Sequence, residues 1–265
     1  MNKFKETAIA AARAGGKILL DNLGKLAPNE ISGKAQFDFV TRVDKESEQC
    51  IIGILREAFP EHSFLAEEMH RDTIGGYRWV VDPLDGTTNY IHGVPIFSVS
   101  IALEKDGEPI LGVVLDPIRD ELFYAEKGAG AWLNGRRIQV SSVSNPEFAL
   151  LATGFPFRVK HLLEVYQRSF NRLFMQVSGI RRAGSAALDL CYVACGRFDG
   201  FWELNLKRWD IAAALVIIRE AGGEITDFAG GAEVLETGNT IASNGLLHPW
   251  IVQIVKETFE GIVER

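Results

Sequence analysis

Two carboxylates, a glycine and two hydroxyls directly follow an apolar run in the stretch Trp79-Val80-Val81-Asp82-Pro83-Leu84-Asp85-Gly86-Thr87-Thr88-Asn89-Tyr90. The apolar run has the aromatic and β-branched character of a buried strand. Pro83 has no N–H to donate to a neighbouring strand, so we expect the strand to end and the chain to turn just after Asp82. The turn would hold Asp82 and Asp85 on one short bend, where Gly86 lets the backbone pass close to a bound group.

Carboxylates held this close repel each other unless a proton or a divalent cation lies between them. Oxygen ligands suit Mg²⁺ better than zinc, so the pair predicts a magnesium site. Gly86, Thr87 and Thr88 could then open a short helix whose free N–H groups point at an anion such as phosphate. The alternative for an isolated D-x-x-D-G-T-T pattern is an acidic turn in which a threonine caps a helix.

Length and composition favour one compact domain, residues 1–265, with a small-molecule partner. Of the 265 residues, 47% are hydrophobic and 24% charged, which is ordinary for a globular protein with a large core. The formal net charge is −7, and basic residues cluster only in short pairs such as Arg136-Arg137 and Arg181-Arg182. Binding to nucleic acid usually needs a basic surface, so we expect no nucleic-acid partner.

The cysteines and the hydropathy indicate the compartment. Cys50, Cys191 and Cys195 cannot all pair, and the last two stand four residues apart in a segment rich in alanine and leucine, which is typical of core thiols. No stretch reaches the roughly 18 apolar residues of a membrane span, and charged residues interrupt residues 1–20. We therefore expect a cytoplasmic protein without a membrane partner.

Two helices are predicted in the first part of the chain, at residues 3–23 and 45–58. The first has apolar residues at helical spacing and ends in turn residues around Gly24 and Pro28. A β-like run then ends in Asp44, whose place just before the second helix is typical of an N-cap.

A short apolar strand, residues 62–66, leads into the adjacent acids Glu67 and Glu68. Neighbouring side chains on an extended segment point to opposite sides. Only one acid should therefore face the turn at Asp82, and we expect it to be Glu67. The alternative is a solvated acidic loop before His70-Arg71-Asp72.

Short apolar runs separated by turn residues predict an antiparallel meander after the central stretch. The runs cover residues 97–103, 110–115, 122–125 and 131–133. Asn134-Gly135 between apolar flanks predicts a two-residue hairpin turn. Residues 141–146 are polar and rich in turn residues, and they predict a seam between two halves, about 1–145 and 146–265.

Helices alternate with strands in the second half. The predicted strands are residues 150–153, 198–204, 224–226 and 240–243, and the predicted helices are residues 162–175, 186–194, 211–221 and 246–259. An antiparallel half and an alternating half indicate an α+β fold in stacked layers of helix and sheet, with the site between them.

Two helix starts in this half carry polar side chains. In Gly184-Ser185-Ala186-Ala187 the hydroxyl can cap its own helix or offer a polar group to a ligand. Asp210 stands at the start of a strongly apolar helix, where the residue taken alone is best explained as an N-cap, and Glu203 ends the strand before it.

Four motifs in this order resemble the inositol monophosphatase family, part of a superfamily of lithium-sensitive, magnesium-dependent phosphatases that includes the fructose-1,6-bisphosphatases. They are Asp38-Phe39-Val40-Thr41-Arg42-Val43-Asp44, Ala66-Glu67-Glu68, Trp79 to Asn89, and Trp209-Asp210 before a helix ending in Ala221-Gly222-Gly223. The resemblance covers nearly the whole chain. It implies a layered α-β-α-β-α sandwich, a homodimer, and Mg²⁺-dependent hydrolysis of phosphate monoesters.

The resemblance implies a magnesium centre. Glu67, Asp82 and the backbone carbonyl of Leu84 would bind a first Mg²⁺, and a third, looser Mg²⁺ is usual near Glu67. Asp82, Asp85 and Asp210 would bind the second, with Asp82 bridging the two. Two neighbouring cations can lower the pKa of a water, orient an in-line attack and stabilise the leaving alkoxide.

The resemblance also implies catalytic and substrate-binding residues. Thr87, hydrogen-bonded to Asp44, would help the metal-activated water lose its proton, which makes Glu67, Thr87 and Asp44 the catalytic set. Amides near Gly86 and Thr87 would hold the phosphate. The expected substrate-binding residues are Gly86, Thr87, Ser185, Ala187, Glu203 and Asp210.

The expected substrate is inositol 1-phosphate. Relatives of this architecture also hydrolyse fructose bisphosphate, histidinol phosphate or phosphoadenosine phosphate, and these alternatives stay open. Lys207 stands where many animal members carry a histidine, and Ala66 replaces a glycine before the acidic pair. A lysine at this position could reach a second phosphate on the substrate, or it could stay solvated on the outer face of its turn.

Other activities fit the motifs less well. A phosphatase with an aspartyl nucleophile needs D-x-D-x-T, whereas two residues separate Asp82 and Asp85, and the P-loop pattern G-x-x-x-x-G-K-[ST] is absent from the sequence. The alternative outside enzymology is an idle member of the fold that binds a metal or a protein. Such a member should have lost ligands, and this chain keeps the expected carboxylates and Thr87.

Overall fold

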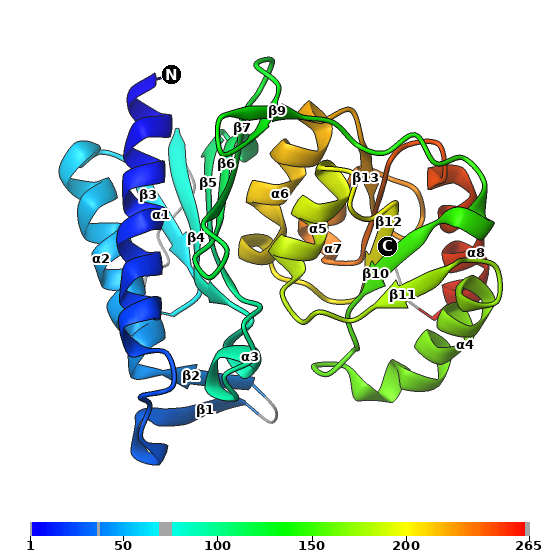
Figure 1. Cartoon of the computed structure of the whole chain (residues 1–265), viewed down its shortest axis with the longest axis horizontal. Helices are drawn as coiled ribbons and strands as arrows, with labels where there is room; N and C mark the ends of the chain where they lie inside the picture. Colours follow the sequence, from blue (N-terminus) through cyan, green and yellow to red (C-terminus); the bar gives the residue numbers. More distant parts are fainter. Residues whose placement is uncertain (1, 36–37, 69–75, 263–265) are drawn as a thin grey trace.

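Two β-sheets alternate with three layers of helices, so that the chain forms a five-layer sandwich (Figure 1). The structure is a computed structural model that describes residues 2–35, 38–68 and 76–262. The helices are α1 (Asn2–Asn22) and α2 (Arg42–Ala58) outside the larger sheet, α5 (Ala186–Ala194) and α6 (Arg208–Glu220) between the sheets, and α4 (Leu163–Phe174) and α8 (His248–Phe259) outside the smaller sheet. The α+β fold with α-β-α-β-α layers is confirmed.

The larger sheet contains the predicted meander. Its strands, in spatial order, are β3 (Ser63–Ala66), β4 (Tyr77–Asp85), β5 (Ser98–Lys105), β6 (Glu108–Asp116), β7 (Glu121–Glu126), β8 (Ala131–Leu133) and β9 (Arg136–Ile138). From β4 to β9 each strand pairs antiparallel with the next, and β3 pairs parallel with β4. The hairpin at Asn134-Gly135 is confirmed, because both residues have the positive φ that this turn requires.

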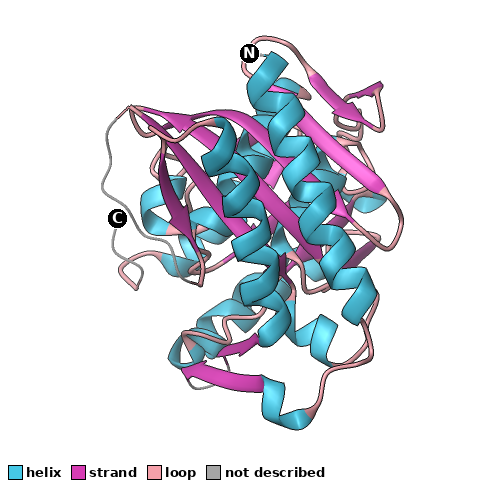
Figure 2. Ribbon diagram, turned by 90° about the vertical axis from the view of Figure 1, so that its left-hand side faces the viewer, coloured by secondary structure: helices cyan, strands magenta, loops and turns pink. Residues whose placement is uncertain are grey.

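Helices cover both faces of the larger sheet, so its central strands are apolar on both sides. In β4, Trp79 and Val81 pack toward α1 and α2, whereas Val80 packs toward α6, as the period of two along a strand dictates. Figure 2 shows two long helices lying across the strands on the outer face. Because both faces are covered, the central strands read as continuous apolar runs in the sequence.

The smaller sheet has the order β11-β10-β12-β14-β13. Its strands are β10 (Leu150–Thr153), β11 (Gly179–Arg181), β12 (Gly200–Glu203), β13 (Glu224–Thr226) and β14 (Thr240–Ser243). The predicted strands at 150–153, 224–226 and 240–243 are confirmed, and the one predicted at 198–204 is shorter. Strand β11 was not predicted, because three residues of which one is glycine give too little pattern.

Several short elements connect the layers. They are β1 (Ile31–Ala35), β2 (Asp38–Thr41), α3 (Thr87–Ile91), α7 (Val234–Thr237) and the 3₁₀ turns at Pro28–Glu30, Pro146–Phe148 and Lys160–Leu162. The β-like run predicted to end in Asp44 therefore ends at Thr41, and its residues 36–37 lie outside the described residues. The alternative loop at His70-Arg71-Asp72 also lies outside them.

The three cysteines are free thiols, of which Cys191 is fully buried while Cys50 and Cys195 are partly exposed. The prediction of a core thiol is thus confirmed for Cys191. Among the described helices, none combines the length and the apolar character that crossing a bilayer requires.

A buried ion network joins the larger sheet to the start of α6. The side chain of Glu104 on β5 has 0% exposure and accepts hydrogen bonds from Arg78 on β4 (2.6 Å from Nη2) and from Arg208 on α6 (2.6 Å from Nε). Arg208 also donates to the carbonyl of Gly107 at 2.7 Å. Because Arg208 lies in the first turn of α6, this network fixes that helix end against the sheet.

We expect Glu104→Gln to lower the free energy of unfolding by about 3 kcal/mol, because it leaves two arginines without their buried counter-charge. The control is Glu108→Gln, which breaks the exposed pair with Lys127 and should cost less than about 1 kcal/mol. Urea unfolding of both variants measures the difference in their free energies of unfolding, provided that their m-values are equal. Equal losses in the two variants would show that the network does not stabilise the fold.

Candidate metal and phosphate site

A β-bulge in β4 brings two carboxylates to the same side of the strand. Asp82 pairs with Ser100 and Asp85 with Ser98, so two residues of β4 lie opposite one residue of β5. In a regular strand, residues three apart point to opposite faces, and the extra residue of the bulge restores a common face. The expected end of the strand at Asp82 is therefore wrong, because the bulge accommodates Pro83 and the strand continues to Asp85.

Asp210 joins these two residues from the start of α6. One carboxylate oxygen from each of Asp82, Asp85 and Asp210 lies within 4.8 Å of the others. The three residues are 1%, 8% and 5% exposed, and they line a cavity of about 320 Å³ between the two sheets. The described residues thus contain a buried cluster of three acids from elements far apart in the sequence.

Glu67 lies at the same cavity, on the segment that follows β3. Its amide donates to the carbonyl of Val81 at 3.2 Å, which continues the pairing of β3 with β4. The amide of the next residue, Glu68, donates to Glu48 on α2 at 2.7 Å. Of the two adjacent acids, only Glu67 is among the described residues that line the cavity, which agrees with the predicted alternation and with the residue that the resemblance selected.

Asp44 and Asp210 were both expected as N-caps, and both expectations are wrong by three residues. Each acid is the third residue of its helix and accepts a hydrogen bond from the amide of the N-cap residue. Asp44 accepts from Thr41 at 2.9 Å, and Asp210 accepts from Lys207 at 2.7 Å. The Thr41-x-x-Asp44 spacing is the capping-box signal that could have located the start of α2. The consequence is that each carboxylate is held rigidly by its own helix.

Asp44 also contacts the threonine that follows the acidic stretch. Thr87 Oγ1 lies 3.1 Å from Asp44 Oδ1 and 3.1 Å from the carbonyl oxygen of Leu84. The expected hydrogen bond between Thr87 and Asp44 is therefore confirmed, and it places the hydroxyl beside the carbonyl of Leu84.

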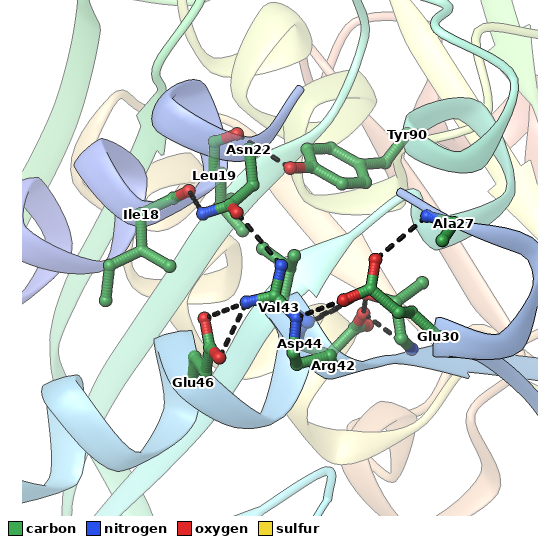
Figure 3. A network of polar contacts seen from close by, with 11 residues as sticks. Ile18, Leu19, Asn22, Ala27, Glu30, Arg42, Val43, Asp44, Glu46 and Tyr90 are labelled. Atoms are coloured by element: carbon green, nitrogen blue, oxygen red, sulfur yellow. Dashed lines mark hydrogen bonds and ion pairs between the residues drawn. The ribbon is translucent and has the colours of Figure 1, made fainter. Parts of the chain in front are cut away.

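A polar network holds the α2 turn that carries Asp44 (Figure 3). Arg42 donates hydrogen bonds to Glu46 within α2 and to Glu30 in the preceding 3₁₀ turn, each at 2.6 Å. It also donates to the side-chain oxygen of Asn22 at the end of α1, at 3.1 Å. From α3, Tyr90 Oη donates to the carbonyl of Leu19 at 2.7 Å. The network ties α1, α2 and α3 together behind Thr87 and Asp44.

The start of α5 holds Asp85 in place. Asp85 Oδ2 accepts from Ser185 Oγ at 2.5 Å and from the amide of Ala187 at 2.9 Å, and its Oδ1 accepts from the amide of Ala186 at 3.3 Å. Ser185 makes no side-chain cap of its own helix, so that alternative is wrong. Ser185 and Ala187 were expected to contact substrate, but both are fully buried behind Asp85, whereas Ala186 and Gly184 line the cavity.

Gly86 follows the bulge with φ of +97°, a left-handed conformation that favours glycine. A Cβ there would lie 3.1 Å from the carbonyl oxygens of Gly184 and Ile96. Gly86 thus makes a close approach to the backbone of two neighbouring segments, and its predicted approach to a bound group stays a prediction. Gly86, Thr87 and Thr88 all line the cavity, and α3 begins at Thr87.

Two further buried carboxyls line the cavity, Glu203 at the end of β12 in the smaller sheet and Asp189 on α5. Burial raises the pKa of Glu203 to about 8, and it raises the pKa of Asp189 well above its ordinary value. A Cβ at Gly154 would lie 1.9 Å from Glu203 Oε1, so only glycine leaves room for this side chain. Glu203 was predicted from the sequence, whereas Asp189 was not, because the apolar pattern of α5 hides it. Asp189 Oδ1 has no hydrogen-bond partner among the described residues.

Two arginines on the cavity wall were also missed. Arg158 and Arg182 line the cavity, and Arg158 Nη1 lies 4.0 Å from Asp210 Oδ2. Both stand in loops without periodic pattern, so only proximity in the fold reveals them. Lys207, considered as a contact for a second phosphate, is half-buried and is not among the described residues that line the cavity.

The electrostatics of the cluster fit a divalent cation. Burial raises the pKa of Asp82 well above its ordinary value, and the charges of Glu67, Asp85 and Asp210 raise it further. Burial also raises the pKa of Asp85 and raises that of Asp210 to about 7. Buried acids of this kind are neutralised by protons or by a cation, and a donor set made only of oxygen suits a hard cation.

Comparison with known proteins identifies the family. The profile of the inositol monophosphatase family matches residues 1–260. The chain belongs to the inositol monophosphatase family. It is 47% identical to the Nus factor SuhB of Pseudomonas aeruginosa over 250 residues, 92% of each chain, and 44% identical to a fructose-1,6-bisphosphatase/inositol-1-monophosphatase of Aquifex aeolicus over 264 residues, 99% of each.

Solved structures agree with this assignment. The structure of an IMPase from Thermotoga maritima superposes with a TM-score of 0.90 at 38% sequence identity, covering 98% of this chain and 99% of the other. Members of the inositol monophosphatase family are metal-dependent phosphatases, and membership supports phosphatase activity for this chain.

The raised pKa values predict how stability depends on pH in the metal-free protein. The pKa of Asp210 rises from an ordinary 3.8 to about 7 in the folded state, and the pKa of Glu203 rises from 4.5 to about 8. Between the ordinary and the folded pKa of each group, the folded state binds more protons than the unfolded chain. Stability must fall with rising pH wherever the folded state binds more protons. We expect the melting temperature of chelator-treated protein to fall between about pH 7 and pH 9, where histidines are neutral in both states.

Saturating Mg²⁺ should remove most of this fall, because the cation replaces the protons on the clustered acids. Glu203→Gln should make the fall shallower even without metal. A melting temperature that is flat or rises over this range in chelator would contradict the assignment of raised pKa values to these acids.

Proposed function

We propose that the chain is a Mg²⁺-dependent phosphate monoesterase that hydrolyses inositol 1-phosphate to inositol and phosphate. The observation that carries the proposal is the buried cluster of Asp82, Asp85 and Asp210, with oxygens within 4.8 Å of one another in a cavity that also contains Glu67. Such a cluster of acids would hold divalent cations, and the cations would in turn attract and neutralise a dianionic phosphate that the acids alone would repel. The alternative substrate within the family is fructose 1,6-bisphosphate, to which the name of the Aquifex aeolicus relative refers.

The acids fall into two ligand groups. Glu67, Asp82 and the carbonyl of Leu84 would hold one Mg²⁺, and Asp82, Asp85 and Asp210 would hold another. Bound Mg²⁺ would supply the Lewis acidity that makes water a nucleophile near neutral pH and neutralises charge on the phosphate. The chain's own contribution is position, since the β4 bulge and the α6 start fix these oxygens before any ligand arrives.

Thr87 and Asp44 would move the proton. The hydroxyl of Thr87 can donate to Asp44 Oδ1 and accept a proton from an attacking water, while Asp44 stays anchored to Thr41. Gly86 and Thr87 would orient the phosphate, and Glu203 would contact a hydroxyl of the alcohol. With a pKa of about 8, the carboxyl of Glu203 is largely protonated at neutral pH, so it can donate a hydrogen bond as well as accept one.

The test of the proposal is phosphate release from inositol 1-phosphate, with fructose 1,6-bisphosphate, histidinol phosphate and phosphoadenosine phosphate in parallel. Mg²⁺-dependent turnover with the highest kcat/KM on inositol 1-phosphate is the expected result. The same assays with added Li⁺ test for the inhibition that is typical of the family. Absence of Mg²⁺-dependent release from all four substrates would favour an idle binding protein.

We expect Asp210→Asn to lower kcat at least about a hundredfold, because it removes one charged oxygen from the cluster at nearly constant volume. The control is Asp21→Asn, which removes an exposed charge from α1. Circular dichroism should show both variants folded, and calorimetry should show weaker Mg²⁺ binding only in Asp210→Asn. Near-normal turnover of Asp210→Asn in saturating Mg²⁺ would contradict the assignment of the acids to two Mg²⁺ ligand groups.

We expect Thr87→Ala to lower kcat by about a hundredfold or more while the Mg²⁺-dependent rise in melting temperature persists. Thr87→Ser keeps the hydroxyl and should restore most of the rate. This pair separates proton transfer from metal binding. Equal kcat values for the alanine and serine variants would remove Thr87 from the mechanism.

We also infer that the enzyme acts in the cytoplasm as a homodimer. Large apolar side chains such as Phe148 and Met175, 73% and 80% exposed, support contact with a second copy. Light scattering coupled to size-exclusion chromatography would measure the mass directly, and a monomer mass of 29.3 kDa at micromolar concentration would contradict the inference.

A further inference from the structure

One face of α2 carries three buried polar side chains. Asp44, Ser47 and Glu48 stand at positions i, i+3 and i+4, a spacing that places them on the same side of a helix. All three are 0% exposed, whereas the other buried residues of α2 are apolar. Buried polar groups need hydrogen-bond partners, and each of these three side chains bonds a different segment of the candidate site.

Ser47 contacts the bulge of β4. Its Oγ donates to the carbonyl of Pro83 at 3.1 Å, and Pro83 lies between the acids Asp82 and Asp85. On the other side of the bulge, the amide of Leu84 donates to Asp82 Oδ1 at 2.9 Å. Because Pro83 has no N–H to donate, the bulge depends on bonds of this kind for its shape. The spacing of Asp82 and Asp85 is therefore tied to α2.

Glu48 contacts the segment that carries Glu67. Glu48 Oε2 accepts from the amide of Glu68 at 2.7 Å, and the amide of Glu67 donates to the carbonyl of Val81 at 3.2 Å. A carboxylate is a stronger acceptor for an amide than a neutral oxygen. The main chain on both sides of the Glu67 Cα is thus held, by α2 on one side and by β4 on the other. These bonds set the direction in which the Glu67 side chain leaves the segment.

Helix α1 packs closely against this face of α2. A Cβ at Gly15 would lie 2.9 Å from Ser47 Oγ and 2.7 Å from Ile51 Cδ1. A side chain at Gly15 would therefore push the two helices apart or displace Ser47. The close packing restricts the rotamers of Ser47 and favours the one that bonds the carbonyl of Pro83.

We propose that Ser47 and Glu48 are positioning residues that set the distance between the acids of β4 and Glu67. The inference rests on the proposed metal-dependent function. Neither residue is among the described residues that line the cavity, so both act through the groups they bond. Because Asp44 stands on the same helix face and bonds Thr87, one rigid turn of α2 relates three parts of the site. Residues that orient metal ligands from behind commonly change metal affinity by about ten- to a hundredfold.

The experiment measures the Kd for Mn²⁺ by calorimetry on the full chain without substrate. We expect Ser47→Ala to raise this Kd about tenfold, because the bulge carbonyl loses its donor and the spacing of Asp82 and Asp85 loosens. Glu48→Met keeps most of the volume but removes the acceptor, and it should also raise the Kd about tenfold. Glu48→Gln keeps an acceptor oxygen for the amide of Glu68 and should restore most of the affinity.

The matched control is Ser169→Ala on α4. Ser169 is equally buried, and its Oγ donates to the carbonyl of Tyr166 at 2.7 Å, away from the described lining of the cavity. Both serine variants lose the same kind of hydrogen bond, so their melting temperatures in chelator should fall by similar amounts. Only Ser47→Ala should bind Mn²⁺ more weakly. If Ser47→Ala does not fold, the contrast between Glu48→Met and Glu48→Gln tests the same role.

Phosphate release by the same proteins separates this inference from the proposed function. Normal turnover, with a Mn²⁺ Kd that is unchanged in Ser47→Ala and Glu48→Met, would overturn the positioning role alone. A wild type that binds Mn²⁺ but releases no phosphate would contradict the phosphatase function, and weaker Mn²⁺ binding by the two variants would still support the positioning role. A wild type that binds no Mn²⁺ would overturn both.

Discussion

The mutual repulsion of Asp82, Asp85 and Asp210 is the constraint on which the rest of the site depends. Burial and proximity raise the pKa of all three carboxyls, so a proton or a cation must neutralise the cluster. The fold holds them together nevertheless, through the β4 bulge, the first turn of α6 and the start of α5. The fold thereby tolerates mutual repulsion at the place where we propose that a cation binds.

The layered architecture explains how residues from both halves of the chain meet. The helices α5 and α6 lie between the sheets (Figure 1). Their first turns contribute Ala186 and Asp210 to the cavity lining. The amides of α5 hold Asp85, while the buried network around Glu104 fixes the start of α6, which carries Asp210. Side chains from the larger sheet therefore supply charge at one wall, and loops of the smaller sheet supply the opposite wall.

Local chemistry was largely predictable from the sequence. The D-x-x-D-G-T-T stretch, the meander and the Asn134-Gly135 turn each have a physical signature within a few residues. The bulge at Pro83 was not predictable, because a proline after an apolar run equally well ends a strand, and only the pairing with Ser98 and Ser100 decides. Arg158, Arg182 and Asp189 have no local signature, since only tertiary proximity brings them to the cavity. The resemblance to a family supplied metal roles that spacing could not.

The most direct test of this account is where a divalent cation binds. Crystals grown with Mn²⁺ in place of Mg²⁺ would show its position by anomalous scattering. The account predicts a peak coordinated by oxygens of Asp82, Asp85 and Asp210, and a second beside Glu67 and the carbonyl of Leu84. If no peak appears at these oxygens at a pH above 8, with millimolar Mn²⁺ present, the cluster is neutralised by protons, and the proposed metal centre is contradicted.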